Sequence, residues 1–393
     1  MSKAPRPILS EVELFGRTLR NRLSVAPMSR VSATDDGFAT NRMKRYYREF
    51  ARGGFGIVIT EGTYTDEDAS QGYDRQPGIA NEQQETSWAP VASAIGEAGS
   101  LAIMQLMHAG ALSQGQSHTG RTIAPSAVQP LGEMMPEYGG SGPYRLPTAM
   151  TASDLAQVRE GFVAAAARAR RAGFDGVEIH AANGYLLDQF ITQYTNLRDD
   201  EYGGSPTARI RYAAEIVAAV RKSSPADFVV GVRVSEAKVN DFQYRWPAGA
   251  AEARTIFTAL AESGASYIHM AGEGRGFREY ISGQQEPLTT VARRMTGLPV
   301  IANGGLHDPD LADAVIQGGH ADLIALGRAA LATPDWPRKL AKGEPVPPFD
   351  HGMISPSASI ENTDAWIDRR RRVQQAAVEF SDGGALGKSH KVA

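Results

Sequence analysis

Three side chains suited to carbonyl chemistry lie close together in residues 180–185. His180 and Asn183 could both bind one carbonyl oxygen, and two such contacts stabilise the negative charge that develops there when a nucleophile adds to a conjugated double bond. Tyr185 carries a hydroxyl whose ordinary pKa is about 10, so it can donate a proton at neutral pH. A bonded core histidine, an asparagine in a turn and a core tyrosine are the alternative interpretation, and these residues alone do not decide between the two.

Two glycine-containing turns could bind a phosphate group. Asn303, Gly304 and Gly305 form the first, and Gly327 and Arg328 form the second, each directly after an apolar run. Glycine lets backbone N–H groups approach an anion closely, and an arginine offers a planar fork of donors. Tight turns without a ligand are the simpler interpretation, but the matching positions of the two turns favour phosphate.

Two further polar side chains, Gln105 and Arg233, fall near the ends of apolar runs. Burying them without partners would be costly, and a ligand with several polar edges would satisfy both. An internal ion pair of Arg233 with Glu61 or Glu178 is the alternative.

Eight short apolar runs must position all of these residues. The runs are almost continuously apolar and rich in β-branched residues, which is typical of parallel strands buried on both faces. They begin at Leu23, Gly56, Leu101, Gly176, Phe228, Tyr267, Pro299 and Asp322. Helical patterns lie between most of them, over residues 155–172, 209–222, 248–263 and 310–317, with Thr151 and Ser153 as candidate N-caps of the first.

Eight strand–helix alternations predict an α/β fold in the form of a closed (β/α)8 barrel, with a doubly wound sheet as the alternative. Residues 8–21 are expected to form an N-terminal hairpin. The connection after the third run is unusually long, and its excess, about residues 112–150, is expected to cap the active face rather than to be disordered. We expect one barrel domain over residues 1–350, followed by an extension over residues 351–393 with a short helix around Asp368 and Arg372 and with disorder from Ser381 onward.

The composition is that of a soluble globular protein of 393 residues with a net charge of −3, which gives no sign of nucleic-acid binding. The chain contains no cysteine, which excludes disulfides, cysteine-bound clusters and a cysteine nucleophile. The N-terminus lacks the apolar region of a signal peptide, and no apolar run is long enough to span a membrane. The cytoplasm is the expected location, and a homo-oligomer remains compatible with the sequence.

Motifs along the chain resemble, in order, those of the old yellow enzyme family of FMN-dependent oxidoreductases. The similarity runs from about Ile8 to Lys342. The matching strings are N-R-L-S-V-A-P-M-S, I-V-I-T-E-G-T, Q-L-M-H-A-G, H-A-A-N-G-Y-L-L-D-Q-F, T-N-L-R-D-D-E-Y-G-G-S, G-V-R-V-S, A-N-G-G and D-L-I-A-L-G-R. Single short motifs would be weak, but this many in register, including the long fourth string, make the resemblance specific.

The resemblance implies FMN bound noncovalently at the mouth of the barrel. The residues that would contact FMN are Ala26, Pro27, Met28, Ser29, Gly62, Gln105, Arg233, Asn303, Gly304, Gly305, Gly327 and Arg328. The first five would lie at the flavin ring, Gln105 at its pyrimidine side and Arg233 near N1 and O2. The last five would hold the phosphate.

The resemblance also implies the reaction. NADPH or NADH would reduce FMN, and hydride would then pass to the β-carbon of an α,β-unsaturated carbonyl compound or a nitro-activated alkene. His180 and Asn183 would hold the substrate oxygen, and Tyr185 would protonate the α-carbon. Two departures are Ser29, where many relatives carry threonine or cysteine, and Val31, where one bacterial branch has a substrate-contacting tyrosine.

Other functions are weaker alternatives. The larger relatives with a cysteine-bound iron–sulfur cluster are opposed by the absence of cysteine. A flavin-free phosphosugar isomerase or aldolase would share the phosphate turns, but a Schiff-base aldolase needs a buried lysine at a strand end. The eight runs contain no lysine, and Lys238 comes only after the fifth. A binding protein without enzymatic activity on the same scaffold is the remaining alternative.

Overall fold

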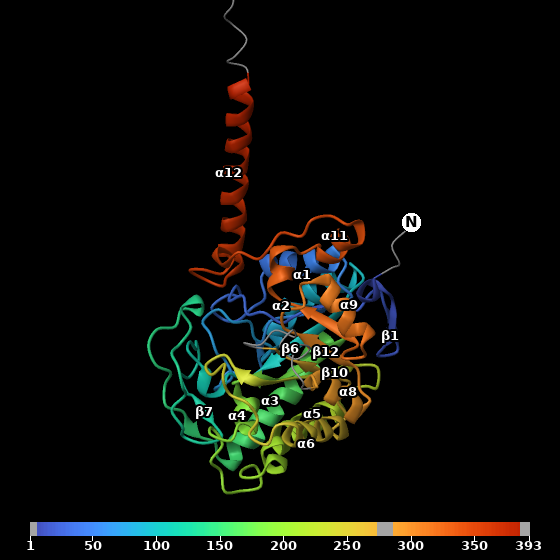
Figure 1. The fold of residues 1–393 in the computed structure, drawn as a ribbon. Coiled ribbons are helices and arrows are strands. Elements are labelled where there is room, and N and C mark those ends of the chain that lie inside the picture. Colours follow the sequence, from blue (N-terminus) through green and yellow to red (C-terminus); the bar gives the residue numbers. More distant parts are fainter. Residues whose placement is uncertain (1–5, 273–285, 386–393) are drawn as a thin grey trace, which may run out of the picture.

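The computed structural model describes residues 6–272 and 286–385 of the chain. Within these residues, eight parallel strands form a closed ring surrounded by helices (Figure 1). In chain order they are β3 (Leu23–Val25), β4 (Ile57–Ile59), β6 (Leu101–Met107), β9 (Gly176–Asn183), β10 (Val229–Lys238), β11 (Tyr267–Met270), β12 (Val300–Asn303) and β13 (Leu323–Leu326). The ring is closed because β4 pairs with both β3 and β6. The predicted (β/α)8 barrel is confirmed.

Helices connect successive strands and cover the outside of the ring. They are α1 (Asn41–Gly53), α2 (Glu82–Gly96), α3 (Ala152–Arg171), α4 (Leu186–Ile191), α5 (Pro206–Ser223), α6 (Ala250–Glu262), α8 (Leu288–Thr296) and α9 (Pro309–Gln317). At the start of α3, Thr151 accepts a hydrogen bond from Asp154 N, and the Asp154 carboxylate accepts one from Thr151 N. This capping box makes Thr151, rather than Ser153, the N-cap.

The barrel carries three additions before and within its strand–helix repeats: a hairpin, a short strand and a long connection. The N-terminal 3₁₀ turn η1 (Pro7–Leu9) leads into the predicted hairpin, an antiparallel pair of β1 (Val12–Leu14) and β2 (Arg17–Leu19). A short strand, β5 (Thr63–Tyr64), adds to β6. The long connection after β6 is ordered and contains η2 (Gly110–Leu112), β7 (Ile123–Ala124), η3 (Pro136–Tyr138) and β8 (Thr148–Ala149). The alternative of a disordered loop is therefore wrong.

Apolar residues fill both faces of the ring, as the continuous apolar runs predicted. One cluster contains alternate strand residues such as Ile57, Leu101 and Ile103 and fills the barrel interior. The intervening residues, such as Val58 and Ala102, belong to the larger cluster that packs against the helices. This alternation follows from the two-residue period of a strand, and it fixes which side chains point into the barrel.

The chain beyond β13 forms α10 (Arg328–Ala332), α11 (Trp336–Lys342), η4 (His351–Met353) and α12 (Ile360–Ala385). Figure 1 shows α12 extending away from the barrel. The expected short helix around Asp368 and Arg372 is thus part of a 26-residue helix. The disorder expected from Ser381 is wrong for residues 381–385, which belong to α12, while residues 386–393 lie outside the described residues.

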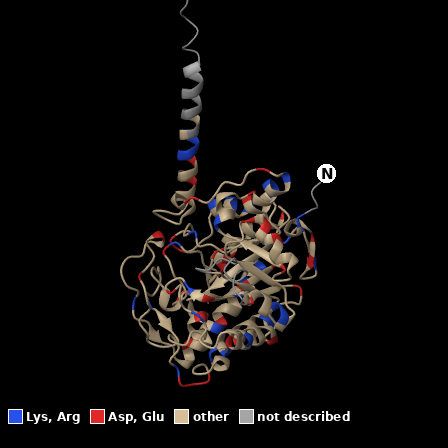
Figure 2. Cartoon of the chain, viewed as in Figure 1, with Lys and Arg blue, Asp and Glu red and all other residues tan. Residues whose placement is uncertain are grey.

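Charged residues of both signs are interspersed over the barrel, with a band of four arginines at residues 369–372 of α12 (Figure 2). Among the described residues, no helix combines the length and the apolar character needed to cross a membrane.

Candidate active site

Near the C-terminal ends of several strands, polar side chains replace apolar ones among the residues that point into the barrel. Gln105 lies two residues after Ile103 of the interior cluster, and His269 lies two residues after Tyr267. The carboxylate of Glu178 accepts hydrogen bonds from Gln105 Nε2 (2.8 Å) and from the Tyr267 hydroxyl (2.9 Å), and it lies 2.8 Å from His269 Nδ1. We call Gln105, Glu178, Tyr267, His269 and the neighbouring Arg233 the inner cluster.

The inner cluster keeps a buried negative charge. Burial alone would favour the protonated form of Glu178, but the His269 ring beside it, and then Arg233, together lower the pKa of Glu178 below its usual value. Arg233 also donates from Nη2 to Asn303 Oδ1 (3.4 Å). Glu61, the other partner considered for Arg233, accepts instead from the Tyr47 hydroxyl (2.9 Å) and from Arg30 N (2.7 Å).

His180, Asn183 and Tyr185, which we call the mouth group, lie at and beyond the end of β9. The His180 and Tyr185 rings are 5.0 Å apart in an edge-on arrangement. Burial, and then the positive charge of Arg233, lowers the pKa of His180 to about 3, so its imidazole is neutral at neutral pH. His180 Nδ1 and Asn183 Oδ1 are buried without a hydrogen-bond partner among the described residues. Such polar atoms are costly to leave unpaired unless a ligand contacts them.

The Tyr185 hydroxyl is hydrogen-bonded to the hydroxyl of Tyr73. Both tyrosines belong to an apolar cluster with Val31 and Met107, against which Met134 and other residues of the long connection pack. The expected capping position of this connection is therefore confirmed around Tyr185. The sequence analysis did not identify Tyr73, because it lies in a loop outside any motif with a chemical signature.

The segment after β3 opens toward the mouth of the barrel. Ala26 is buried and donates from its backbone N–H to Leu326 O (2.9 Å), whereas Pro27, Met28 and Ser29 are only half-buried. Arg30 anchors the end of this segment, because it donates to the carbonyl oxygens of residues 358 and 359 just before α12.

Gly62 lies after β4, close against the Met107 side chain. A Cβ atom there would overlap Met107 Sδ, and the Gly62 carbonyl accepts a hydrogen bond from Gln76 Nε2 (2.7 Å). The backbone at this point is therefore close-packed on β6, which carries Gln105.

The two glycine turns are brought together by the pairing of β12 with β13, in which Asn303 lies opposite Ala325. Gly304 and Gly305 have φ values of 118° and 70°, in the region that glycine adopts easily. Gly327 immediately precedes α10, whose first residue is the exposed Arg328. Backbone N–H groups and a guanidinium thus occur on one side of the mouth.

The family model described as the NADH:flavin oxidoreductase / NADH oxidase family matches residues 12–346. The chain belongs to this family. Membership confirms the resemblance to old yellow enzymes, and the family description supports FMN as the cofactor and NADH or NADPH as the reductant. Family membership also argues against the alternative of a flavin-free isomerase or aldolase.

The curated relatives fall into longer and similar-sized proteins. NADH oxidase of Thermoanaerobacter brockii is 30% identical over 347 residues, which cover 86% of this chain and 51% of that protein. NADPH dehydrogenase of Geobacillus sp. is 32% identical, with 85% of this chain and 94% of the relative covered. 12-Oxophytodienoate reductase 1 of Oryza sativa is 31% identical, with 88% of this chain and 89% of the relative covered. The chain therefore spans about half or less of the length of the longer relatives, and most of the length of the similar-sized ones.

Solved structures agree with this assignment. The old yellow enzyme homologue from Zymomonas mobilis is 30% identical, with a TM-score of 0.77 and with 88% of this chain and 94% of that chain covered. Morphinone reductase in complex with tetrahydroNAD is 29% identical, with a TM-score of 0.80 and coverage of 92% and 97%.

The mouth of the barrel fits FMN chemically. The glycine turns beside Arg328 can hold a phosphate group, and the polar side chains of Gln105 and Arg233 can meet the polar edges of a planar ligand. Gln105 and Arg233 point inward beside it, with the carboxylate of Glu178 between their strands.

Sequence reasoning missed several buried polar residues. His269 could have been found, because it interrupts an apolar run predicted to be buried on both faces, and Glu178 was considered only as an ion-pair partner of Arg233. Lys238 also differs from expectation: β10 extends to this residue, and its amine is buried against Asp188 rather than lying beyond the strand.

Proposed function

We propose that this chain is an ene-reductase that reduces the activated C=C bond of α,β-unsaturated carbonyl compounds or nitroalkenes. Noncovalently bound FMN would supply the hydride chemistry, taking hydride from NADH or NADPH and delivering it to the β-carbon. The observation that carries the proposal is the mouth group, in which a neutral imidazole with an unpaired ring nitrogen and a buried carboxamide lie close to a tyrosine hydroxyl.

His180 and Asn183 bind the substrate oxygen. The carboxamide of Asn183 can donate through Nδ2, and the neutral imidazole of His180 can donate through one ring nitrogen. Two donors on one carbonyl oxygen polarise the conjugated bond and stabilise the enolate that forms. The low pKa of His180 keeps this imidazole a neutral donor, so it does not place a second full positive charge beside Arg233.

Tyr185 donates the proton to the α-carbon. Its hydroxyl is held by Tyr73, whose own pKa is raised well above 10 by burial, so the Tyr73 hydroxyl stays protonated. The apolar cluster and the capping connection around this pair exclude water and so limit proton transfer from solvent.

The remaining residues hold the cofactor. Ala26, Pro27, Met28, Ser29 and Gly62 line the flavin ring. Gln105 binds its pyrimidine side, Arg233 stabilises negative charge on its reduced form, and the phosphate group is bound by Asn303, Gly304, Gly305, Gly327 and Arg328. The names of two similar proteins, 12-oxophytodienoate reductase and morphinone reductase, also support a reductase of small molecules.

The proposal is tested by following the flavin absorption of the purified protein without oxygen. The yellow band should bleach when NADPH or NADH is added and return when a cyclic enone or a nitroalkene from a substrate panel is added, with the saturated product recovered. A protein that binds no added FMN, or reduced flavin that no activated alkene reoxidises, would contradict the proposal.

A further inference from the structure

The turn that carries Asn183 has an unusual backbone. Asn183 and Gly184 have φ values of 66° and 87°. A positive φ is easy for glycine but costs a residue such as asparagine about 1 kcal/mol or more, so the surroundings must hold it in place. The Asn183 side chain, the proposed substrate grip, can point into the mouth only while this conformation persists.

All four backbone polar groups of the two residues are hydrogen-bonded. Asn183 N donates to Ser235 Oγ (2.8 Å), and its carbonyl accepts from Val239 N (3.1 Å). Gly184 N donates to Asp188 Oδ2 (2.7 Å), and its carbonyl accepts from Gln189 Nε2 (2.7 Å). The turn is therefore clamped between the end of β10 on one side and α4 on the other.

A buried ion pair joins these two sides. Lys238 Nζ donates to Asp188 Oδ1 (2.6 Å), so one carboxylate binds both the lysine and the Gly184 N–H. The two side chains are 1% and 0% exposed. Burial lowers the pKa of Lys238 and raises that of Asp188, and each partner opposes the shift of the other.

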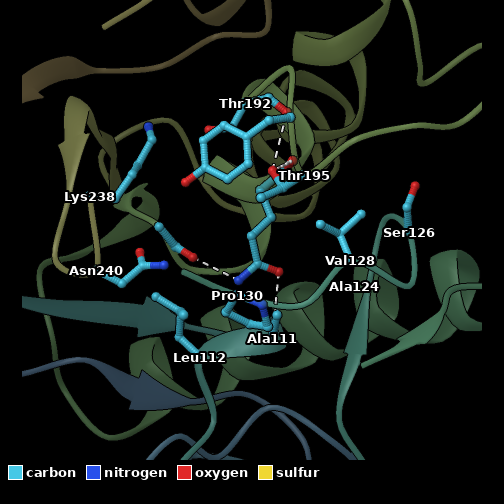
Figure 3. A pocket seen from close by; sticks show the side chains of 13 residues that line it. Ala111, Leu112, Ala124, Ser126, Val128, Pro130, Thr192, Thr195, Lys238 and Asn240 are labelled. Atoms are coloured by element: carbon cyan, nitrogen blue, oxygen red, sulfur yellow. Dashed lines mark hydrogen bonds between the residues drawn. The ribbon is translucent and has the colours of Figure 1, made fainter. Parts of the chain in front are cut away.

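The amine has few other contacts that could hold it. It lies 3.4 Å from the Ser235 carbonyl and 4.9 Å from the centre of the Tyr244 ring. The register of β10 against β9 shifts between Val234 and Lys238, and this irregularity brings Lys238 opposite Asn183. Figure 3 shows Lys238 and Asn240 on one side of a pocket, with Ser126 and Val128 of the capping connection on the other.

We propose that Lys238 is a positioning residue for substrate binding, which fixes the Asn183 turn through the carboxylate of Asp188. Without Lys238, Asp188 is a buried anion with the Gly184 N–H and the Thr192 hydroxyl to compensate it, and it must move toward water or take up a proton. Either change loosens the turn from the side of α4. This inference rests on the proposed role of Asn183 as a substrate grip.

The test measures the dissociation constant of a simple phenol, which stands in for the substrate enolate oxygen, from the change it causes in the flavin spectrum. Lys238→Met should weaken phenol binding about tenfold, which corresponds to about 1.4 kcal/mol. The double variant Asp188→Asn with Lys238→Met removes both charges and keeps an acceptor for Gly184 N–H, so it should restore the affinity to within about threefold of wild type.

A second buried ion pair provides the matched control. Arg209 and Glu252 join α5 to α6, with side chains 4% and 1% exposed; Arg209 also donates to the Ile191 carbonyl at the last residue of α4, but neither side chain bonds to residues 183–189. Arg209→Met should lower the melting temperature as Lys238→Met does, yet leave the phenol dissociation constant within about twofold of wild type. A milder variant, Ser235→Ala, removes only the acceptor of Asn183 N and should weaken phenol binding about threefold to tenfold.

Three results would overturn the inference. The first is an unchanged phenol dissociation constant in Lys238→Met or, if that variant does not fold, in Ser235→Ala. The second is phenol binding that Arg209→Met weakens as much as Lys238→Met does. The third is a charge-neutral double variant that does not restore phenol binding. Failure of the proposed function is distinguished by replacing His180 and Asn183 with alanine. If that variant binds phenol as tightly as wild type, the substrate grip itself is wrong.

Discussion

The inner cluster and the mouth group meet at β9, which carries Glu178, His180 and Asn183, but the two groups differ in how their polar atoms are satisfied. In the inner cluster, the carboxylate of Glu178 is bonded to three side chains and carries a stabilised charge. In the mouth group, His180 is neutral and keeps an unpaired nitrogen, and Asn183 keeps an unpaired oxygen. A permanently bound cofactor needs a fixed charge beside it. A substrate that binds and dissociates needs neutral groups that still have free hydrogen-bonding atoms.

The largest expected effect concerns the proton donor of the mouth group. Tyr185→Phe should slow reoxidation of the reduced flavin by a cyclic enone about 10²-fold to 10⁴-fold, the usual contribution of a general acid, while reduction by NADPH or NADH stays within a few-fold. Stopped-flow measurement of the two half-reactions separates these effects.

The control for this variant is Tyr144→Phe, which changes a tyrosine of the same apolar cluster. It should leave both half-reactions close to wild type. If Tyr185→Phe slowed the two half-reactions equally, the difference between donor and cofactor functions would be lost, and the assignment of Tyr185 would be wrong.

Replacing both His180 and Asn183 with alanine should be the next largest change. Loss of two hydrogen bonds of about 1–1.5 kcal/mol each predicts roughly 100-fold weaker phenol binding. FMN affinity should change much less, because the inner cluster and the glycine turns remain. A titration of each ligand, followed by flavin absorption and fluorescence, tests this. Equal losses for phenol and FMN would show that the two regions do not act separately.

Glu178→Gln should act on the other region. Removing the buried anion leaves the positive charge of Arg233 less compensated, so negative charge on the reduced flavin is better stabilised and the midpoint potential should rise by roughly 30 mV, a tenfold shift for two electrons. Spectroscopic titration against a reference dye measures the potential. A fall in the potential would reverse the expected sign and contradict this view of the inner cluster.

The smallest effect is expected when the pH is changed. Because the pKa of His180 is lowered to about 3, its imidazole should not titrate between pH 5.5 and 8. Its contribution to folding stability is complete above the ordinary histidine pKa of about 6.5 and declines as the pH falls toward 3. The affinity for a cyclic ketone without ionisable groups should therefore vary less than about twofold over that range, and a tenfold change centred near pH 6.5 would disprove a neutral His180.

Much of the fold and part of the site followed from the sequence. Strands buried on both faces leave continuous apolar runs, and polar residues near the ends of these runs, such as Gln105 and Arg233, could be located from this pattern alone. The position of Asn183 beside a turn could be expected too, since a glycine follows it.

The rest depends on contacts between distant segments. Tyr73 bonds to Tyr185 across more than one hundred residues, and no local pattern marks it. Lys238 reaches Asp188 only because β10 shifts its register near its end, which an apolar run does not reveal. The length of α12 was missed because its charged central residues, including Asp368 and Arg372, suggested only a short solvated helix.

The most direct test of the division between the two regions is an experimental structure of the FMN-loaded protein with a simple phenol bound. The phenol oxygen should lie within hydrogen-bonding distance of both His180 and Asn183, with its ring over the flavin and near the Tyr185 hydroxyl. Gln105 and Arg233 should contact the flavin and not the phenol. A phenol oxygen bound to Arg233, or a flavin whose pyrimidine edge contacts His180 and Asn183, would contradict the account.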